Sequence, residues 1–557
     1  MQPKRKTKRS GLSRRQALKL SGLALGGLAT VSTSGKGGEA KVVPAAGCYP
    51  TAQKTQVYEY YENLPWITPW EWDINGNVMG TKLEENEMRI TFMGSTVPMP
   101  RRAQAEMSIF VEVGWNDSTN KPEDQFIFDF GCGVSANYQA AGVDFGRMDK
   151  IFINHLHADH VSDLVHVYGF GDGADRKSPL YIFGQGPTTV PNPGMGPAIT
   201  NPLGPPANNY PSTPATYQDG LTTFCYHLRE MLRWHTESQA FQGSAYRSYP
   251  SLEQIASDWG LPYVPSPVSD DPPNDANAII PIELDWTIKG LDANGIPTYD
   301  NIAYHNASTR AMVTHYPVMH CRQGAMGYKL VWTPRGGGKP LTMIYSSDTK
   351  PEWNSINQAI NKDTNGIAQG VDVFIHEMAV APAIWAMKMM GLSAPGSGPY
   401  WDSALAALQA VQDSSHTPQG AFGYVLSQIK PRPRLAVATH FPTSNDTVAC
   451  ALESVNAQCP DITREGEQMI WSFDLMVLRV FPDKILQCKA RVNDFSYNPP
   501  IPPSDLPRDL YAPKYHTAAG AADPFAQLDL TGATDVQIQS TQNGGYNGKP
   551  TFDESGY

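Results

Sequence analysis

The segment His155-Leu156-His157-Ala158-Asp159-His160 constrains this chain more than any other feature. It follows an apolar strand-like run, residues 150–154, and precedes a stretch with a helical pattern, residues 161–169. The three imidazoles and the carboxylate therefore project from a loop at the end of a strand. Neutral imidazoles combined with one hard anion suit Zn²⁺ or another divalent first-row ion. The segment predicts a metal site, and a histidine-rich surface loop is the alternative interpretation.

Short runs of β-branched and aromatic residues, each ended by turn residues, flank this segment. Strands are expected at 88–94, 108–113, 125–129, 150–154, 180–183, 279–287, 328–332, 341–347, 371–375 and 435–439. Helical patterns fall between several of them. This alternation predicts an α/β sandwich rather than an all-β or all-helical fold.

Three further candidate ligands lie beside predicted strands. His320 comes just before one strand, Asp348 ends the run 341–347, and His440 ends the run 435–439. Open α/β sheets build their sites at the carboxyl ends of strands. A single histidine or aspartate there is more often a hydrogen-bonded structural residue, but three with the same placement favour a metal centre with more than one ion.

At this point the sequence resembles the metallo-β-lactamase superfamily, in particular its ribonuclease Z and arylsulfatase-like branch. The resemblance covers about residues 88–184 and 280–480. One departure is Ser347-Asp348-Thr349, where the family usually has Gly-Asp-Thr. The other matching motifs are Phe92-Met93-Gly94-Ser95 with the later Arg101, Asp129 within residues 128–133, the segment 155–160, His320 followed by Gly327-Tyr328, His376-Glu377, and Thr439-His440-Phe441.

The resemblance implies the fold class and the cofactors. The fold would be α/β, a four-layer αβ/βα metallo-β-lactamase sandwich with a large insertion. The cofactors would be two divalent metal ions, with zinc expected and manganese or iron as alternatives. The resemblance further implies that His155, His157 and His320 hold one ion, that Asp159, His160 and His440 hold the other, and that Asp348 bridges them.

The resemblance also suggests catalytic residues. His376, oriented by Glu377, is expected to protonate the leaving group as a general acid, and Asp159 is counted with them as catalytic. In the alternative interpretation, Glu377 simply caps a turn. His315 is near enough to His320 to be a rival ligand. The histidines treated as ordinary are His166, His227, His235, His305, His315, His416 and His516.

The organisation of the chain follows from its changes in composition. We expect a twin-arginine signal peptide at 1–40, an aromatic N-terminal wrap at 41–87 and the catalytic domain at 88–184 and 279–495. Residues 185–278 form an insertion of loops and helices, with helical stretches at 222–241 and 251–259. Residues 496–557 are rich in Pro and Gly and are expected to form an extended arm.

The N-terminus predicts export. Arg14-Arg15 lies in a basic segment, and a Gly-rich apolar stretch from Leu20 to about Val31 follows it. That stretch is too short to span a bilayer, which takes about 20 residues. No later stretch reaches that length, so we expect a soluble periplasmic or extracellular protein that engages the twin-arginine export machinery. Its seven cysteines fit an oxidising compartment without defining a disulfide framework.

Charge and spacing bear on the substrate. The net charge of −11 argues against a protein that mainly grips nucleic-acid phosphates. The resemblance would place a tRNA-gripping arm between His320 and Asp348, but only 28 positions separate the two residues. The insertion is rich in aromatic residues, which suits a small ester better than a polyanion. In the alternative interpretation, which is favoured for most of them, these side chains form the insertion's own core.

The sequence therefore predicts an exported dinuclear metal hydrolase that cleaves small phosphodiesters or sulfate esters with a metal-bridging hydroxide. The layout also resembles exported hydrolases of this superfamily associated with guanitoxin biosynthesis, a label that defines no reaction. One alternative is a ribonuclease Z-like RNA endonuclease. The other is a non-catalytic metal- or ligand-binding protein on the same scaffold. The sequence does not define an oligomeric state.

Overall fold

The structure of the chain is a computed structural model. It describes residues 82–171, 173–188, 219–239, 249–268, 277–389, 399–464 and 469–490, together with four short strands near the N-terminus. Those strands are β1 (Thr55–Gln56), β2 (Trp66–Ile67), β3 (Trp70–Trp72) and β4 (Val78–Gly80). The expected signal peptide and the C-terminal arm lie outside the described residues.

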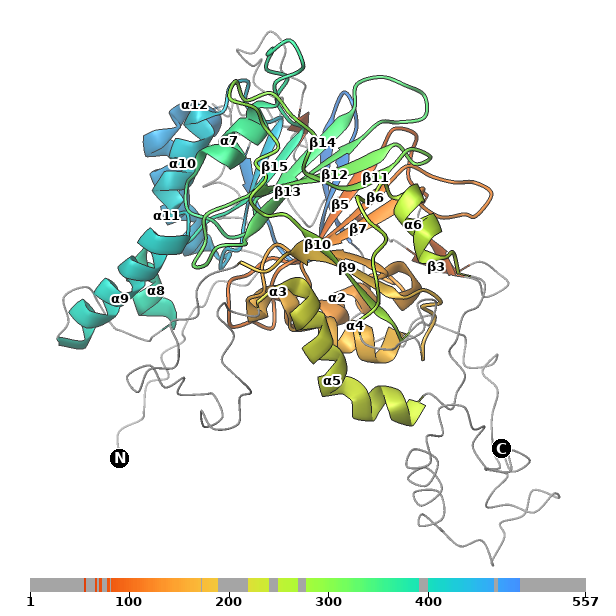
Figure 1. The fold of residues 1–557 in the computed structure, drawn as a ribbon. Helices are drawn as coiled ribbons and strands as arrows, with labels where there is room; N and C mark the ends of the chain where they lie inside the picture. The colour runs from red at the N-terminus through yellow and green to blue at the C-terminus, as the bar shows by residue number, and fades with distance from the viewer. Residues whose placement is uncertain are drawn as a thin grey trace, which may run out of the picture.

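Two large sheets form the centre of the fold (Figure 1). The first sheet has the order β1-β19-β18-β5-β6-β7-β8-β9-β10, with β2 also paired to β19. Its strands from β7 to β10 run parallel to one another. The remaining bounds are β5 (Met88–Gly94), β6 (Ser108–Val113), β7 (Asp124–Phe128), β8 (Lys150–Phe152), β9 (Leu180–Gln185), β10 (Ile279–Leu284), β18 (Met476–Val480) and β19 (Ile485–Ala490).

The second sheet has the order β11-β12-β13-β14-β15-β16-β17. Strands β11 to β14 are antiparallel neighbours, whereas β14 to β17 are parallel. Their bounds are β11 (Ile302–Asn306), β12 (Ala311–Pro317), β13 (Met326–Trp332), β14 (Leu341–Tyr345), β15 (Val373–Glu377), β16 (Leu435–Thr439) and β17 (Met469–Trp471).

Apolar residues on alternate positions of the strands explain why the sheets stack. In β6, Ile109 and Val111 face the core between the sheets, while Phe110 faces a second core on the outside. Because successive side chains of a strand point to opposite faces, a strand covered on both faces must be apolar throughout. The inner core joins the two sheets through aromatic contacts such as Phe128 with Tyr328, whose ring centroids are 5.7 Å apart.

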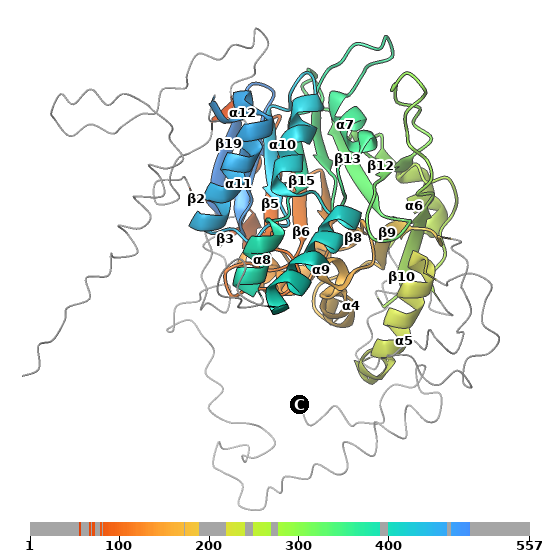
Figure 2. The same ribbon diagram turned by 90° about the vertical axis from the view of Figure 1, so that its left-hand side faces the viewer.

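Helices cover the outer face of each sheet (Figures 1 and 2). The first sheet packs against α2 (Val134–Ala140), α4 (Leu164–Gly171) and α5 (Leu221–Gln239). The second packs against α7 (Trp353–Ile360), α10 (Gln419–Gln428) and α11 (Asn445–Gln458). The expected four-layer αβ/βα sandwich is confirmed. The other helices are η1 (Phe145–Arg147), α3 (Ala158–Val161), α6 (Leu252–Asp258), α8 (Pro382–Met389), α9 (Pro399–Ser415) and α12 (Pro460–Arg464).

The segment expected to be an insertion connects two neighbouring strands. Strand β9 ends at Gln185 and β10 begins at Ile279, and the two pair in parallel along six residues each. Helix α5 packs on this pair, and α6 reaches the inner core through Leu252 and Ile255. The chain thus leaves the sheet and returns to the adjacent position. The boundaries of the domains themselves stay predictions.

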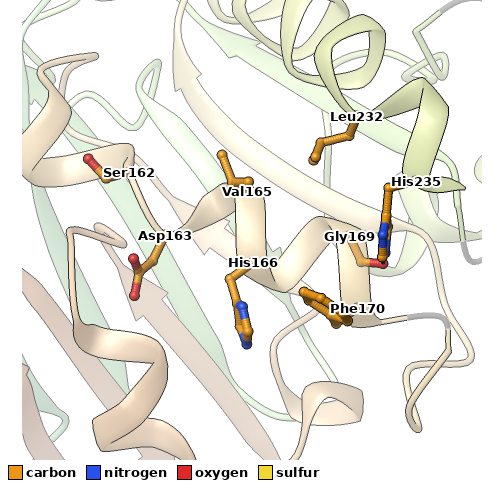
Figure 3. A pocket seen from close by; sticks show the side chains of 8 residues that line it. All are labelled: Ser162, Asp163, Val165, His166, Gly169, Phe170, Leu232 and His235. Carbon is orange, nitrogen blue, oxygen red and sulfur yellow. The ribbon is translucent and has the colours of Figure 1, made fainter.

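A groove lies between α4 and α5 on the outer face of the first sheet (Figure 3). Its volume is about 410 Å³. The ring of Phe170 lies 4.8 Å from that of His235, and His235 Nε2 lies 2.8 Å from the carbonyl oxygen of Gly169. None of the candidate metal ligands lines this groove. The residues that do are Ser162, Asp163, Val165, His166, Gly169, Phe170, Leu232 and His235.

Two further observations concern sequence-based expectations. Within the part of the chain that the structure describes, no helix is long and apolar enough to cross a membrane. Five cysteines whose side chains the structure describes carry free thiols, namely Cys132, Cys225, Cys321, Cys450 and Cys459.

Candidate metal centre

The carboxyl ends of the parallel strands in both sheets meet at one edge of the sandwich. Strand β8 leads into the segment 155–160, and β14, β15 and β16 lead to Asp348, Glu377 and His440. The two edges are joined at Asn154, whose carbonyl oxygen accepts from the backbone N–H of Met326 at 3.0 Å. Strand direction therefore brings together side chains that are nearly 300 residues apart in the sequence.

His155, His157 and His320 form the first cluster. Their ring centroids lie 4.6 to 4.8 Å apart, and His320 Nε2 lies 3.0 Å from His157 Nδ1. Three imidazoles that aim ring nitrogens at one point leave room for a cation between them. This is the trio expected to hold one ion.

Asp159, His160, Asp348 and His440 form the second cluster, and all four residues are buried. His440 Nε2 lies 3.1 Å from Asp159 Oδ2, and His160 Nε2 lies 3.4 Å from the same oxygen. Asp348 Oδ2 lies 3.5 Å from His160 Nε2 and 3.9 Å from His320 Nε2. Asp348 thus stands between the two clusters, which is the placement that a bridging carboxylate needs.

Several buried polar atoms at this edge have no hydrogen-bond partner, and their chemistry shows whether the site fits a metal ion. Buried polar groups are normally hydrogen-bonded, because an unpaired one costs about 1–3 kcal/mol. Here both ring nitrogens of His155, Nε2 of His160, Oδ1 of Asp348 and Nδ1 of His440 are buried without a hydrogen-bond partner. Imidazole nitrogens and carboxylate oxygens are the ligands of zinc and similar ions. The residues present therefore fit two divalent ions.

Neighbouring groups fix the orientation of two ligands. His160 Nδ1 lies 2.8 Å from Asp129 Oδ2, which also accepts the Tyr345 hydroxyl at 2.8 Å. His320 Nδ1 lies 2.9 Å from the carbonyl oxygen of Ser415. In both rings a proton on Nδ1 leaves Nε2 with its lone pair toward the centre. Such outer contacts set the tautomer and raise the basicity of a ligating histidine.

Three residues at strand ends have positive backbone φ angles, namely Asp129 at 60°, Ser347 at 55° and His440 at 51°. Side chains other than glycine pay a steric cost there of about 1–2 kcal/mol. Such strain at a site persists only when the surrounding structure holds it. Where this chain has Ser347, the family that it resembles usually has glycine, and glycine would adopt this φ angle without the steric cost.

Glu377 contacts a histidine that the sequence did not single out. His416 follows the C-terminus of α9, and its Nδ1 lies 2.8 Å from Glu377 Oε2. The His416 ring centroid is 5.0 Å from that of His320 and 5.8 Å from that of His440. The other oxygen of Glu377 accepts from the backbone N–H of Thr349. Glu377 is thus a buried positioning group that holds both His416 and the loop of Asp348.

His376 faces the other side of β15. Its ring packs between Phe374 and Phe422, with centroid distances of 5.3 and 5.7 Å, and its Nδ1 lies 2.8 Å from the carbonyl oxygen of Glu377. Adjacent residues of a strand point to opposite faces, so Glu377 reaches the centre and His376 does not. The rival ligand His315 is buried on β12 and belongs to neither cluster.

The pKa values of these groups reflect their mutual charges. Burial alone would raise the pKa of Asp159, but His160 and His440 lower it far below its usual range. Burial would lower the pKa of His416, but Glu377 at 2.8 Å raises it. The pKa of His416 is therefore raised, so its imidazole stays protonated to a higher pH than usual and can hold a proton beside the clusters.

Curated proteins match this chain over short segments. No protein-family model matches the chain. Over 98 residues it is 35% identical to ribonuclease Z of Halorubrum lacusprofundi, which is 17% of this chain and 28% of that protein. Over 99 residues it is 30% identical to ribonuclease BN of an Enterobacter species, again 17% of this chain and 30% of the relative. The matches thus span less than a third of these relatives.

Solved structures of similar fold share little sequence with the chain. A metallo-β-lactamase fold protein from Bacillus subtilis covers 71% of this chain at 10% identity, with all of that protein covered and a TM-score of 0.37. The short form of human tRNase Z covers 71% of this chain at 15% identity, with 99% of that protein covered and a TM-score of 0.31.

The two-sheet sandwich with helices on its outer faces and two ligand clusters at one edge is the metallo-β-lactamase fold. The curated proteins that share a local segment with it are ribonucleases Z and BN.

Proposed function

We propose that this chain is a metal-dependent hydrolase of ester bonds, with phosphodiesters as the leading substrate class. The observation that carries the proposal is the position of Asp348 Oδ2, 3.5 Å from His160 Nε2 and 3.9 Å from His320 Nε2. One carboxylate oxygen shared by two histidine clusters supports a dinuclear centre.

Two divalent ions bound here would supply a water that loses its proton near neutral pH and would stabilise charge on the phosphoryl oxygens. Zinc is the proposed metal, with manganese or iron as alternatives.

The chain's own residues orient the ligands and supply a proton to the leaving group. Asp129 and the Ser415 carbonyl hold His160 and His320 in the tautomer that keeps Nε2 directed at the centre. His416, rather than His376, is the proposed proton donor: Glu377 holds its Nδ1 proton, and Nε2 gives its proton to the departing oxygen. The leaving group thereby departs as an alcohol or phenol rather than as an anion.

The experiment is hydrolysis of bis(p-nitrophenyl) phosphate by the zinc-loaded protein, with His157→Ala as its comparison. We expect kcat/KM to fall by about three orders of magnitude in the variant, together with loss of metal from the cluster of His155 and His320. Stoichiometric zinc binding without turnover of any activated ester would overturn the enzyme proposal and favour the binding protein.

A second candidate is an RNA endonuclease, which the sequence matches to ribonuclease Z favour. Strands β13 and β14 form a simple hairpin joined by residues 333–340, which leaves no room for a long arm between His320 and Asp348. We therefore rank small diesters first, sulfate esters after them, and RNA last. Cleavage of a tRNA precursor at lower protein concentration than bis(p-nitrophenyl) phosphate would place RNA ahead of small diesters.

We also propose export through the twin-arginine pathway, based on Arg14-Arg15 and the apolar stretch after it. A fusion of residues 1–46 to a reporter should reach the periplasm of a bacterial host. Replacement of both arginines by lysine should retain the reporter inside the cell. Periplasmic delivery that survives this double replacement would contradict the proposal.

A further inference from the structure

A pocket of about 350 Å³ adjoins the first cluster. His155, His157 and His320 form one of its walls, and the start of α5 forms the opposite wall. A volume of this order holds a small molecule or one arm of a larger one. The complete lining is His155, Leu156, His157, Gln185, Asp219, Gly220, Thr223, Phe224, His227, His320, Arg322, Gln323 and Ala325.

Arg322 lines this pocket two positions beyond the ligand His320. Its Nη2 lies 2.6 Å from Asp219 Oδ2, and its side chain is 44% exposed. A guanidinium is planar and always charged, and it binds carboxylates, sulfates and phosphates through paired donors. A ligand that extends from the first cluster toward α5 would contact this arginine.

Asp219 holds Arg322 in a fixed frame. Asp219 Oδ1 accepts the backbone N–H of Thr188 at 2.9 Å, and Oδ2 accepts the Thr188 hydroxyl at 2.5 Å. The carbonyl oxygen of Asp219 accepts from Gln185 Nε2 at 3.2 Å. These contacts tie the end of β9 and the start of α5 to the loop that carries His320. A side chain held in this way loses little conformational freedom when a ligand binds.

The other residues that line the pocket indicate the polarity and shape of its ligand. Leu156 and the half-buried Phe224 supply apolar surface, which suits a flat ring. Asp219 is the one acidic side chain among the residues that line the pocket, and Asp159 and Asp348 do not line it. The pocket therefore combines a ring-sized apolar wall with a cation at its edge.

We propose that this pocket binds one arm of the substrate, a compact ring that carries an anionic group, and that Arg322 selects for that group while Asp219 positions Arg322. The inference rests on the proposed hydrolase function, and it names the substrate as an ester with one small anionic aryl-like arm. A purely structural role of the Arg322–Asp219 pair would instead affect metal retention or folding equally for every substrate.

The test uses two diesters with the same leaving group, 4-carboxyphenyl 4-nitrophenyl phosphate and phenyl 4-nitrophenyl phosphate. We expect the zinc-loaded protein to favour the carboxylated arm by about tenfold in kcat/KM, mainly through KM. Arg322→Gln should abolish this preference, and Arg322→Lys should retain part of it. Arg335→Gln, at an exposed arginine paired with Glu123 outside the pocket, should leave it unchanged.

A binding experiment separates the pocket from the chemistry. Calorimetry with 4-carboxyphenylphosphonate and phenylphosphonate should show the same tenfold preference, about 1.4 kcal/mol, and its loss in Arg322→Gln. If neither diester is hydrolysed but this binding preference holds, the hydrolase proposal fails and the pocket assignment stands. Hydrolysis without any preference, or a preference that survives in Arg322→Gln, overturns the pocket assignment alone.

Discussion

Glu377 Oε2 and His416 Nδ1 lie 2.8 Å apart, although 39 positions separate the two residues in the chain. The α8–α9 segment lies between them in sequence and returns His416 to the end of the strand on which Glu377 lies. The carboxylate thereby controls the tautomer of an imidazole that stands beside both ligand clusters.

This pair predicts how the rate depends on the leaving group. With 4-nitrophenolate, a good leaving group, His416→Gln should reduce kcat only a few fold, because the phenolate needs little protonation. With alkyl leaving groups the loss should reach about 10²–10⁴-fold, the range of general acid catalysis. The measurement is the slope of log kcat against leaving-group pKa across a series of diesters, which should become steeper in the variant.

His376→Gln is the matched control for that series, since His376 neighbours Glu377 but faces Phe374 and Phe422. We expect its slope to equal that of the unaltered protein, with lower thermal stability because a buried ring is lost. A steeper slope in His376→Gln and an unchanged slope in His416→Gln would return the proton-donor role to His376.

Asp129 predicts an effect on metal affinity. Replacement by Asn removes the charge that orients His160 and should weaken zinc binding by about 10–100-fold. Competition with a chromophoric chelator measures the affinity of each site, and the site that includes His160 should be affected most. Asp144→Asn, at a carboxylate beside η1 outside both clusters, serves as the comparison. Equal affinities in all three proteins would contradict the orienting role.

The backbone at Ser347 predicts a change in stability. Its φ of 55° is costly for serine, so Ser347→Gly should raise the free energy of unfolding by up to about 1 kcal/mol. Ser347→Val should lower it, since a β-branched side chain is worse still at this angle. Urea unfolding of the metal-free proteins measures both. Ser346→Gly is the control, and we expect it to destabilise by about 0.5–1 kcal/mol.

His315 predicts a dependence of stability on pH. Burial lowers its pKa from 6.5 to about 4, although Asp285 acts in the opposite direction. The unfolded chain then binds a proton below pH 6.5 that the folded chain takes up only near pH 4. The stability that His315 contributes is therefore complete above pH 6.5 and is lost as the pH falls toward 4, by up to about 3 kcal/mol.

The check is urea unfolding of the metal-free protein at several pH values between 7 and 4. His315→Gln should flatten the dependence between pH 6.5 and 5. His305→Gln changes an exposed histidine on the neighbouring strand β11 and should follow the unaltered protein. A slope that is the same in all three proteins would show that His315 does not contribute.

Much of the fold could be predicted from the sequence because strands buried on both faces are continuous apolar runs. The expected ranges 88–94, 108–113 and 435–439 coincide with β5, β6 and β16. The helical ranges of the insertion, 222–241 and 251–259, lie within one or two residues of α5 and α6. Local pattern was sufficient there, since each element is defined by residues close in sequence.

The ligand clusters were also accessible, because each ligand lies directly before or after a recognisable strand. His416 was not, since it follows a helix and nothing near it distinguishes it from other histidines. Its role depends on where the α8–α9 segment returns. The orientation of His376 and Glu377 has a different origin. Neighbours in a strand point to opposite faces, so one of them had to face away, but the sequence does not say which. Asp219 and Arg322 meet only through tertiary packing.

The parallel pairing of β9 with β10 has a consequence for how such proteins diversify. The segment leaves the sheet at Gln185 and returns at Ile279, at opposite ends of two neighbouring parallel strands, and the pairing of these strands fixes both points. Its content can therefore lengthen, shorten or be exchanged without a change in the strands that carry the ligands. In an evolving lineage, the choice of substrate arm at α5 can drift while the chemistry at the metal edge stays the same.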